Sequence, residues 1–291
     1  MIYLDNAAST PIHKDVLTEM LPFLAEQYGN PSSIHKLGRT ANKAIQNARK
    51  QIANLINAQA DEIFFTSGGT ESNNITLYGF AYAKKGNHVI TSSIEHEAVL
   101  EPCKRLEKDG LSVTYLPVSS DGLVDPMDVK NAITKDTCLV SIMFANNEVG
   151  TVQPIKDISK ICKEKQIPFH SDAVQAVGKM PIDIKDLELS AMSISSHKLN
   201  GPKGIGALYI KKGIKIEPLI LGGGQENGIR SGTENVASIV GFGKACELAK
   251  ENLQKNIVHL KSLRDSLMSK ITSEIPHVSF NGNREKRIPN N

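Results

Sequence analysis

LSAMSISSHKLNGPKGIGALYIK, residues 189–211, sets two short apolar runs on either side of a polar turn. The runs at 189–195 and 204–211 have the length and composition of buried strands, and a Gly-Pro turn separates them. Similar runs recur upstream, with helix-like stretches between them, at 62–66, 88–94, 112–118, 138–145 and 167–173. Strands that alternate with amphipathic helices predict an α/β fold, with a mostly parallel seven-stranded sheet and helices on both faces.

Two longer helical stretches frame this sheet. Amphipathic patterns at 35–56 and 244–269 predict helices, and the second is expected to lead away from the large domain. We therefore expect a large domain over residues 15–250. Residues 1–14 and 251–291 are expected to form part of a small α+β domain that is incomplete in this chain.

The C-terminal residues HVSFNGNREKRIPNN, 277–291, contain one strand-like run followed by a turn. A lone strand cannot be stable without a neighbour to pair with. Either a strand from the N-terminal segment pairs with it, or the chain is a fragment of a longer protein. Both explanations predict a strand in this segment.

Composition places the chain among ordinary soluble globular proteins. Of its 291 residues, 40% are hydrophobic and 22% charged, and no apolar run is long enough to span a membrane. The net charge of +3 comes from basic and acidic residues mixed along the chain, which argues against nucleic acid as the primary partner. The chain enters MIYLDNAAST with no signal-peptide pattern, so a cytoplasmic location is expected.

The cysteines are spread along the chain and form no C-x-x-C pair; they are Cys103, Cys138, Cys162 and Cys246. Each has apolar neighbours in a helix-like or strand-like stretch, so buried, reduced thiols are expected. The sequence has no Cys/His spacing typical of zinc, and we expect no metal site.

Chemically active side chains follow the predicted strands, where the loops and helix N-termini of a parallel sheet gather. After the first strand comes Ser67-Gly68-Gly69-Thr70, whose unpaired N–H groups and helix dipole suit a phosphate. The same Gly-Gly pair also fits a plain structural turn, so it does not establish a site by itself.

Asp172 ends an apolar strand, and Gln175 follows it three residues later. A carboxylate in a partly buried cleft needs a cation, and a protonated pyridine nitrogen is one such partner. Gln175 would lie on the same side if a helix started here, within reach of a phenolic oxygen on the same ring. An ordinary N-cap aspartate is the alternative for Asp172.

The polar turn contains the strongest local signal. Ser195, His197 and Lys198 lie together in SSHKLNGPKG, between a strand end and a Gly-Pro turn. Burial near other cations lowers the pKa of a lysine toward the free amine that a Schiff base requires. A surface lysine in a polar loop is the alternative, and Lys203 in the same turn is a second candidate.

Three further segments bring polar residues to strand ends or to a glycine-rich loop. His96 could stack on a flat ring or move protons, although lone histidines more often cap helices. Asn147 could bind a carboxylate or a ring oxygen, or serve as a turn asparagine. The glycine-rich loop 221–235, with Arg230 and Thr233, is expected to reach over a cleft or to another subunit, unless it is simply exposed.

Together these segments describe a phosphate-binding turn, a carboxylate for a cationic ring nitrogen and a lysine able to form a Schiff base. Pyridoxal 5'-phosphate (PLP) requires these three groups. Eight stretches carry a family resemblance: YLDNAAST, YGNPSSIH, FTSGGTESNN, SSIEHEAV, ANNEVGTVQPI, HSDAVQAVGK, SSHKLNGPKGIGALY and GGGQENGIRSGTEN. They resemble cysteine desulfurases, the class-V aminotransferase-like branch of fold-type I PLP-dependent transferases, over essentially the whole chain.

The resemblance implies a role for each candidate residue. Lys198 would hold the cofactor as a Schiff base, Asp172 would pair with the pyridine nitrogen, and Gln175 would bind the phenolic oxygen. His96 would stack on the ring and move protons, and Asn147 would lie beside the cofactor oxygen and the substrate carboxylate. In a homodimer the phosphate would be held by Gly69, Thr70, Ser195 and His197, and by Thr233 of the other subunit.

The resemblance also implies an activity. A PLP-dependent cysteine desulfurase would convert L-cysteine to L-alanine and pass the sulfur to a protein persulfide, for an iron-sulfur scaffold or for tRNA thiolation. The nucleophilic cysteine and a substrate-binding arginine of the family lie beyond this chain, so we expect it to bind PLP but to turn over poorly. Two alternatives stay open: a selenocysteine lyase or small-amino-acid aminotransferase of the same branch, and a non-catalytic PLP-binding scaffold.

Overall fold

A computed structural model of the chain describes residues 2–83 and 86–291. Its centre is a seven-stranded sheet with the order β1-β7-β6-β5-β4-β2-β3. The strands are β1 (Ile63–Thr66), β2 (His88–Ser92), β3 (Ser112–Leu116), β4 (Thr137–Ser141), β5 (Phe169–Asp172), β6 (Ala191–Ser195) and β7 (Gly206–Ile210). Each strand overlaps one of the seven predicted runs, so all seven predictions are confirmed.

The strand directions confirm a mostly parallel sheet. In the described residues six strands run parallel to one another, and β7 runs antiparallel to its neighbours β1 and β6. Several predicted runs extend past the carboxyl end of the strand; the run at 138–145, for example, stops pairing as a strand at Ser141. Residues 142–145 remain buried, and the main chain still contacts β5 there: Ile142 N donates to His170 O at 3.2 Å and Phe144 N to Asp172 O at 2.8 Å.

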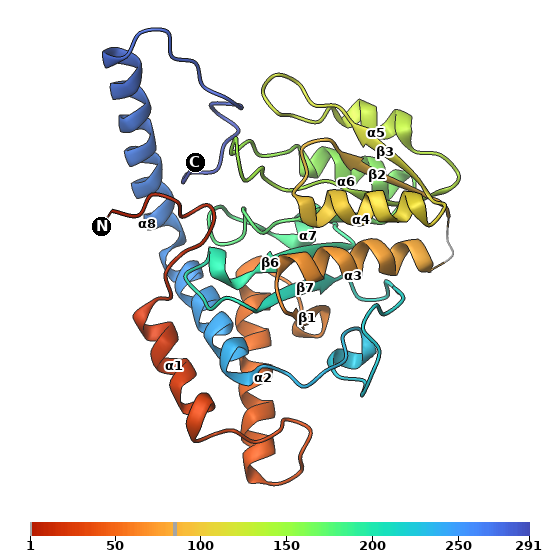
Figure 1. The fold of residues 1–291 in the computed structure, drawn as a ribbon, viewed down its shortest axis with the longest axis vertical. Coiled ribbons are helices and arrows are strands. Elements are labelled where there is room, and N and C mark those ends of the chain that lie inside the picture. The colour runs from red at the N-terminus through yellow and green to blue at the C-terminus, as the bar shows by residue number, and fades with distance from the viewer. Residues whose placement is uncertain (1, 84–85) are drawn as a thin grey trace.

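Helices surround the sheet (Figure 1). They are α1 (Lys14–Ala25), α2 (Lys36–Ile56), α3 (Gly69–Tyr82), α4 (Glu97–Lys108), α5 (Pro126–Ala132), α6 (Ile155–Glu164), α7 (Ile184–Leu187) and α8 (Val236–Glu274), with short 3-10 turns at Ala60–Glu62, Ser196–Lys198 and Glu226–Gly228. The helix predicted at 35–56 is α2. None of the helices in the described ranges combines the length and hydrophobicity needed to cross a membrane.

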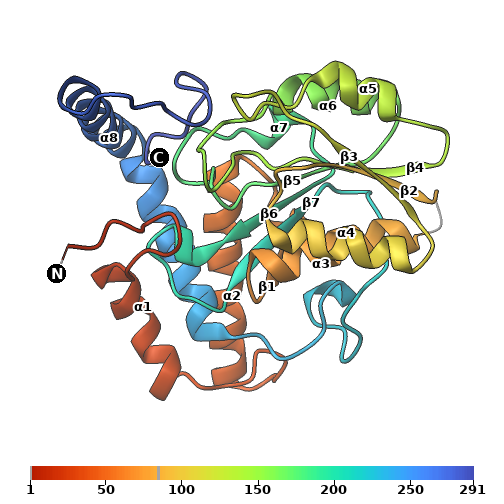
Figure 2. The same ribbon diagram turned by 45° about the horizontal axis from the view of Figure 1, so that its top comes forward.

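Helices lie on both faces of the sheet, as predicted (Figure 2). A hydrophobic cluster packs on each face. On one face α3 and α4 contribute Ile75 and Leu106, and on the other α2 and α8 contribute Ile52 and Phe242. Every residue of the inner strands β4, β5, β6 and β7 is buried, because helices cover both sides of them.

The last helix begins earlier than predicted. α8 starts at Val236 rather than near residue 244, and it packs along α2 through small residues. A side chain at Gly243 would come within 2.6 Å of the Cα of Ala48, so glycine is what lets the two helices approach. The second half of the helix then runs out from the sheet layers (Figure 1).

The prediction of a strand in residues 277–291 is wrong. This segment forms turns, with an isolated bridge between Arg287 and Thr151, and it packs on the turn that follows β4. Val152 N donates to Lys286 O at 2.8 Å, and Ile288 N donates to Gly150 O at 3.0 Å. Within the described residues the apolar run has no neighbouring strand to pair with, so it does not form a strand.

Candidate active site

Nine of the ten predicted site residues line one cavity of about 480 Å³ at the carboxyl edge of the sheet. They are Gly69, Thr70, His96, Asn147, Asp172, Gln175, Ser195, His197 and Lys198. They follow the carboxyl ends of five strands, β1, β2, β4, β5 and β6. These ends share one edge of the sheet because the five strands run parallel to one another. Thr233 does not line this cavity and is exposed on the glycine-rich loop.

Lys198 closes the short 3-10 turn after β6 and is half-buried. Its Nζ donates to two main-chain carbonyls of the N-terminal segment, at 2.5 Å to Ala7 O and 2.8 Å to Ala8 O. Burial lowers the pKa of Lys198, although the negative charges of Asp172 and Asp5 oppose this shift. These contacts hold the Lys198 amine at the cavity wall. Lys203, the competing candidate, is exposed and lines no part of this cavity.

Asp172 ends β5 with its side chain 7% exposed. Its Oδ2 accepts from Asn73 Nδ2 at 2.6 Å, and its Oδ1 accepts from Val174 N at 3.0 Å. Burial raises the pKa of Asp172, while those hydrogen bonds and the charges of His96 and Lys198 pull it down. The side chain therefore caps the following turn and also presents a buried carboxylate to the cavity.

Gln175 lies in the turn that follows Asp172, where no helix forms between residues 173 and 180. Its Nε2 donates to Ala7 O at 3.1 Å, the carbonyl that also accepts from Lys198. Its Oε1 accepts from Lys179 Nζ at 2.8 Å. The turn, rather than a helix, brings Gln175 to the same cavity as Asp172.

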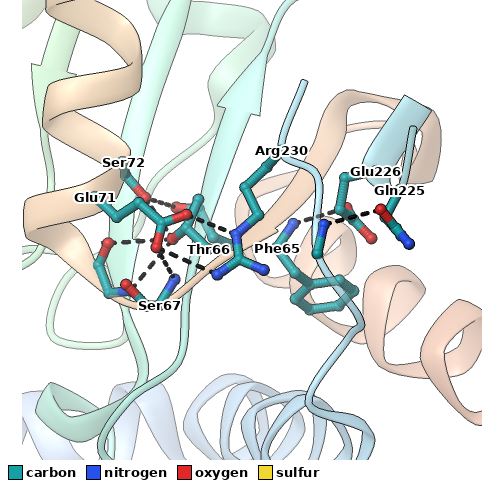
Figure 3. Close-up of polar contacts among 11 residues, drawn as sticks. Phe65, Thr66, Ser67, Glu71, Ser72, Gln225, Glu226 and Arg230 are labelled. Carbon is teal, nitrogen blue, oxygen red and sulfur yellow. Dashed lines mark hydrogen bonds and ion pairs between the residues drawn. The ribbon is translucent and has the colours of Figure 1, made fainter. Parts of the chain in front are cut away.

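The turn Ser67–Thr70 joins β1 to α3, which begins at Gly69. Glu71 Oε2 accepts from Ser67 N at 3.0 Å, and Arg230 Nε donates to Glu71 Oε1 at 2.7 Å (Figure 3). Burial alone would raise the pKa of Glu71, but the hydrogen bonds from Arg230 and Ser67 lower it. The turn is thus held in place from outside the cavity, and its N–H groups stand at the start of a helix.

His96 and Asn147 serve local structure and also line the cavity. His96 is the N-cap of α4, and its Nδ1 accepts from Ala98 N at 3.0 Å. Asn147 Nδ2 donates to the neighbouring Glu148 Oε1 at 2.7 Å. Because a cap uses only Nδ1, the rest of the His96 ring remains available to a flat ligand.

The N-terminal segment is the part of the site that the sequence analysis missed. Asp5, Ala7 and Ala8 line the cavity, and Thr10 Oγ1 donates to His197 O at 2.7 Å. Thr10 N donates to the same carbonyl at 2.9 Å. The motif YLDNAAST contributed to the family resemblance, but two alanines carry no chemical signal of their own.

The glycine-rich loop 221–235 is fastened to the sheet layers at two points. Glu226 is 8% exposed, and its carboxylate accepts from Arg49 Nη1 and Nη2 at 2.7 Å each and from Phe65 N at 2.8 Å. The second point is the ion pair between Arg230 and Glu71 (Figure 3). Residues 221–235 contribute no wall to the cavity, so this loop does not cover the site of its own chain.

All four cysteines are buried and unpaired by disulfides, as predicted. Burial raises the pKa of Cys103 and of Cys162 to about 12, and it raises the pKa of Cys138 and of Cys246 as well. None of these four thiols lines the cavity. Because burial disfavours the thiolate, we expect none of them to act as a nucleophile.

Comparison with known proteins agrees with this geometry. The model of the class-V aminotransferase family matches residues 2–290. The chain belongs to this family. It is 56% identical to cysteine desulfurase IscS from Dictyoglomus turgidum, over all of this chain and 74% of that protein. It is 53% identical to the IscS of Methanosarcina thermophila, over all of this chain and 72% of that protein.

Solved structures give the same assignment within the class-V family. A NifS-like protein superposes with a TM-score of 0.95 at 44% identity, covering 99% of this chain and 80% of that one. The structure of SspA in complex with cysteine superposes with a TM-score of 0.83 at 46% identity, covering 85% of this chain and 72% of that one. The resemblance to cysteine desulfurases is therefore confirmed, and so is the fold.

Class-V aminotransferases are PLP-dependent, and the residues of this cavity fit that cofactor. Asp172 is a buried carboxylate with no ion-pair partner among the described residues, which suits the cationic nitrogen of a pyridine ring. Lys198 presents an amine of lowered pKa to the same space. The N-terminus of α3 offers main-chain N–H groups to a phosphate.

Proposed function

We propose that this chain is a PLP-dependent cysteine desulfurase that converts L-cysteine to L-alanine and passes the sulfur to a protein thiol. One observation carries the proposal: side chains from five strand ends meet in one cavity with Lys198 in its wall. The relatives named cysteine desulfurase, over the whole of this chain, support the same activity.

Each polar group of the cavity has a task in holding the cofactor. Lys198 would bind the aldehyde carbon, Asp172 would meet the pyridine nitrogen, and the Gln175 amide would serve the phenolic oxygen. His96 would stack on the ring. Gly69, Thr70, Ser195 and His197 would hold the phosphate near the start of α3.

The residues around Lys198 support its second task, which is to move a proton. When bound, PLP supplies an electron sink that stabilises negative charge on the substrate α-carbon. The Nζ of Lys198 would take the α-proton, and burial favours this role because it lowers the pKa of the amine. The carbonyls of Ala7 and Ala8 hold that nitrogen at the cavity wall.

L-cysteine is the substrate that the comparisons favour, since the SspA structure is a complex with cysteine. Asn147, on the loop after β4, lines the cavity, and we propose that it meets the substrate carboxylate and the cofactor oxygen. The sulfur acceptor is none of the four buried cysteines described above. We propose that a separate protein thiol, and then an iron-sulfur scaffold, receives the sulfur.

A homodimer is part of the proposal. α1 exposes a row of apolar side chains, Leu17, Leu21 and Leu24, and the loop after it exposes Tyr28 and Ile34. Such a row on one helix suits the same face of a second copy. Thr233, exposed and away from its own cavity, is the residue we expect to complete the phosphate site of the partner.

The division into a large domain over 15–250 and a small one from 1–14 and 251–291 remains a prediction. The outward course of the second half of α8 supports it (Figure 1). The cytoplasmic location also remains a prediction.

Lys198→Ala, with Lys203→Ala as the matched control, tests the cofactor proposal. The purified protein should be yellow with PLP, and borohydride should fix the cofactor to the Lys198 peptide, as read by mass spectrometry. Lys198→Ala should lose this attachment, and Lys203→Ala should keep it because its side chain is exposed in the same turn. A colourless wild-type protein that ignores PLP would refute the proposal.

Substrate choice is tested separately. The PLP-loaded protein is incubated with L-cysteine and a thiol, with L-selenocysteine, or with an amino donor and a keto acid. Alanine and sulfide from the first mixture are expected, in equal amounts. Alanine from selenocysteine alone, or transfer of the amino group, would assign the chain to another activity of the same family.

A further inference from the structure

Lys179 is a buried lysine next to the proposed site that none of the roles above uses. It lies at the end of the turn after β5, is 9% exposed, and does not line the cavity. Its Nζ donates to Gln175 Oε1 at 2.8 Å. No carboxylate forms an ion pair with it within the described ranges 2–83 and 86–291. Burial of an amine with only a neutral amide as its partner costs free energy, so the presence of a lysine at this position calls for an explanation.

The contact settles which way the amide of Gln175 faces. An ammonium group has donors and no acceptor, so Lys179 can meet only the oxygen of the amide. Oε1 therefore points inward, and Nε2 points toward the cavity, where it donates to Ala7 O at 3.1 Å. That carbonyl also accepts from Lys198 Nζ, so one chain of contacts joins the two lysines.

The positive charge of Lys179 also acts on the proposed site. Burial, and then the charge of Lys198, lower the pKa of Lys179 to about 8, which leaves it mostly protonated near neutral pH. Lys179 in turn helps to lower the pKa of His197, after burial, Lys198 and Lys203. Asp172 and Asp5 are the negative groups that face Lys198 from the other side.

We propose that Lys179 is a positioning residue that fixes Gln175 with its amide N–H groups facing the cofactor ring. The inference rests on the proposed function, because it assigns Gln175 to the phenolic oxygen of PLP. Without Lys179 only the Ala7 carbonyl holds the amide in this orientation, and an amide that turns presents its oxygen to the phenolic oxygen. Lys179 acts through Gln175, and it touches neither the substrate nor the cofactor itself.

A double-mutant cycle on PLP affinity tests this role. Lys179→Met and Gln175→Ala should each raise the Kd for PLP by about tenfold, the worth of one hydrogen bond to a charged acceptor. The double variant should bind no worse than Gln175→Ala alone. Lys185→Met, on the exposed surface of α7, is the matched control and should bind like the wild type.

The absorbance of the bound cofactor supplies a second readout that a merely structural lysine would not move. Loss of the donor and of a nearby positive charge favours the protonated chromophore, so its pH midpoint should rise by about one unit in Lys179→Met and in Gln175→Ala. Lys179→Arg, which keeps a donor-only cation, should restore the wild-type midpoint. If Lys179→Met does not fold, Lys179→Gln takes its place. A neutral amide can accept a hydrogen bond as well as donate one, so it does not fix the orientation of the Gln175 amide.

Two results would overturn the inference while leaving the proposed function intact. One is a wild-type Kd and midpoint in the Lys179→Met variant. The other is an equal loss of affinity on removing Lys179 in the presence and in the absence of the Gln175 side chain, which would mean that Lys179 acts elsewhere. A wild-type protein that fails to bind PLP through Lys198 would instead refute the proposed function.

Discussion

His170 is expected to make the protein less stable in mild acid. It lies on β5 in the middle of the sheet, fully buried, and both ring nitrogens have partners: Ser141 Oγ at 2.9 Å and Ser193 Oγ at 3.0 Å. Burial lowers its pKa from 6.5 to about 3. The folded protein therefore keeps this ring neutral at pH values where the unfolded chain protonates it.

The sign and size of the effect follow from linkage. Below pH 6.5 the unfolded state binds a proton that the folded state excludes, so stability falls as the pH falls toward 3. Each pH unit in this window costs about 1.4 kcal/mol. Between pH 7 and pH 5, His170 should therefore remove about 2 kcal/mol from the free energy of unfolding.

The assay compares the wild type with His170→Gln, a polar side chain that does not titrate. Urea unfolding of the cofactor-free proteins, followed by circular dichroism at pH 7 and pH 5, isolates the His170 contribution because all other titrating groups cancel. His259→Gln, exposed on α8, is the matched control and should keep the wild-type pH dependence. An identical loss of stability in the wild type and in His170→Gln would refute the reasoning.

Three further outcomes follow from contacts described above. Glu226→Gln leaves the guanidinium of Arg49 buried without its counterion, so it should lower the free energy of unfolding in urea by about 3 kcal/mol. Asp61→Asn removes one partner of an exposed ion pair and should not change this free energy measurably. Gly206→Ala puts a Cβ 2.7 Å from the Cα of Gly68, so it should displace the turn before α3 and raise the Kd for PLP in a binding titration. The four cysteines should react with a thiol reagent only after denaturation, because burial raises their pKa values; rapid labelling of the native protein would contradict this.

The strands could be predicted from the sequence because both faces of the inner sheet are covered. A strand buried on two sides reads as a continuous apolar run, and such runs at 189–195 and 204–211 marked β6 and β7. The start of α8 could not be found in this way. Gly241 and Gly243 weaken the helical pattern there, although they are the residues that let α8 approach its neighbours.

The polar part of the site was predictable for a related reason. Side chains that end parallel strands share one edge, so chain order alone places Asp172 and Lys198 near each other. The N-terminal wall of the cavity was not predictable. Ala7 lies 191 residues from Lys198 in the sequence, and it contacts Lys198 through a main-chain carbonyl. Lys179 was also missed, because a lysine beside a glycine reads as an exposed turn until its burial is known.

The antiparallel strand β7 explains how the turn that carries Lys198 is held in place. β7 runs antiparallel between β1 and β6, so the turn that carries Lys198 is anchored in the sheet at both of its ends. In register, Gly206 pairs with Ser195 on one side and with Thr66 on the other. Gly206 thus links the turn that carries Lys198 to the strand that leads into the turn Ser67–Thr70, so we expect a change in either turn to displace the other.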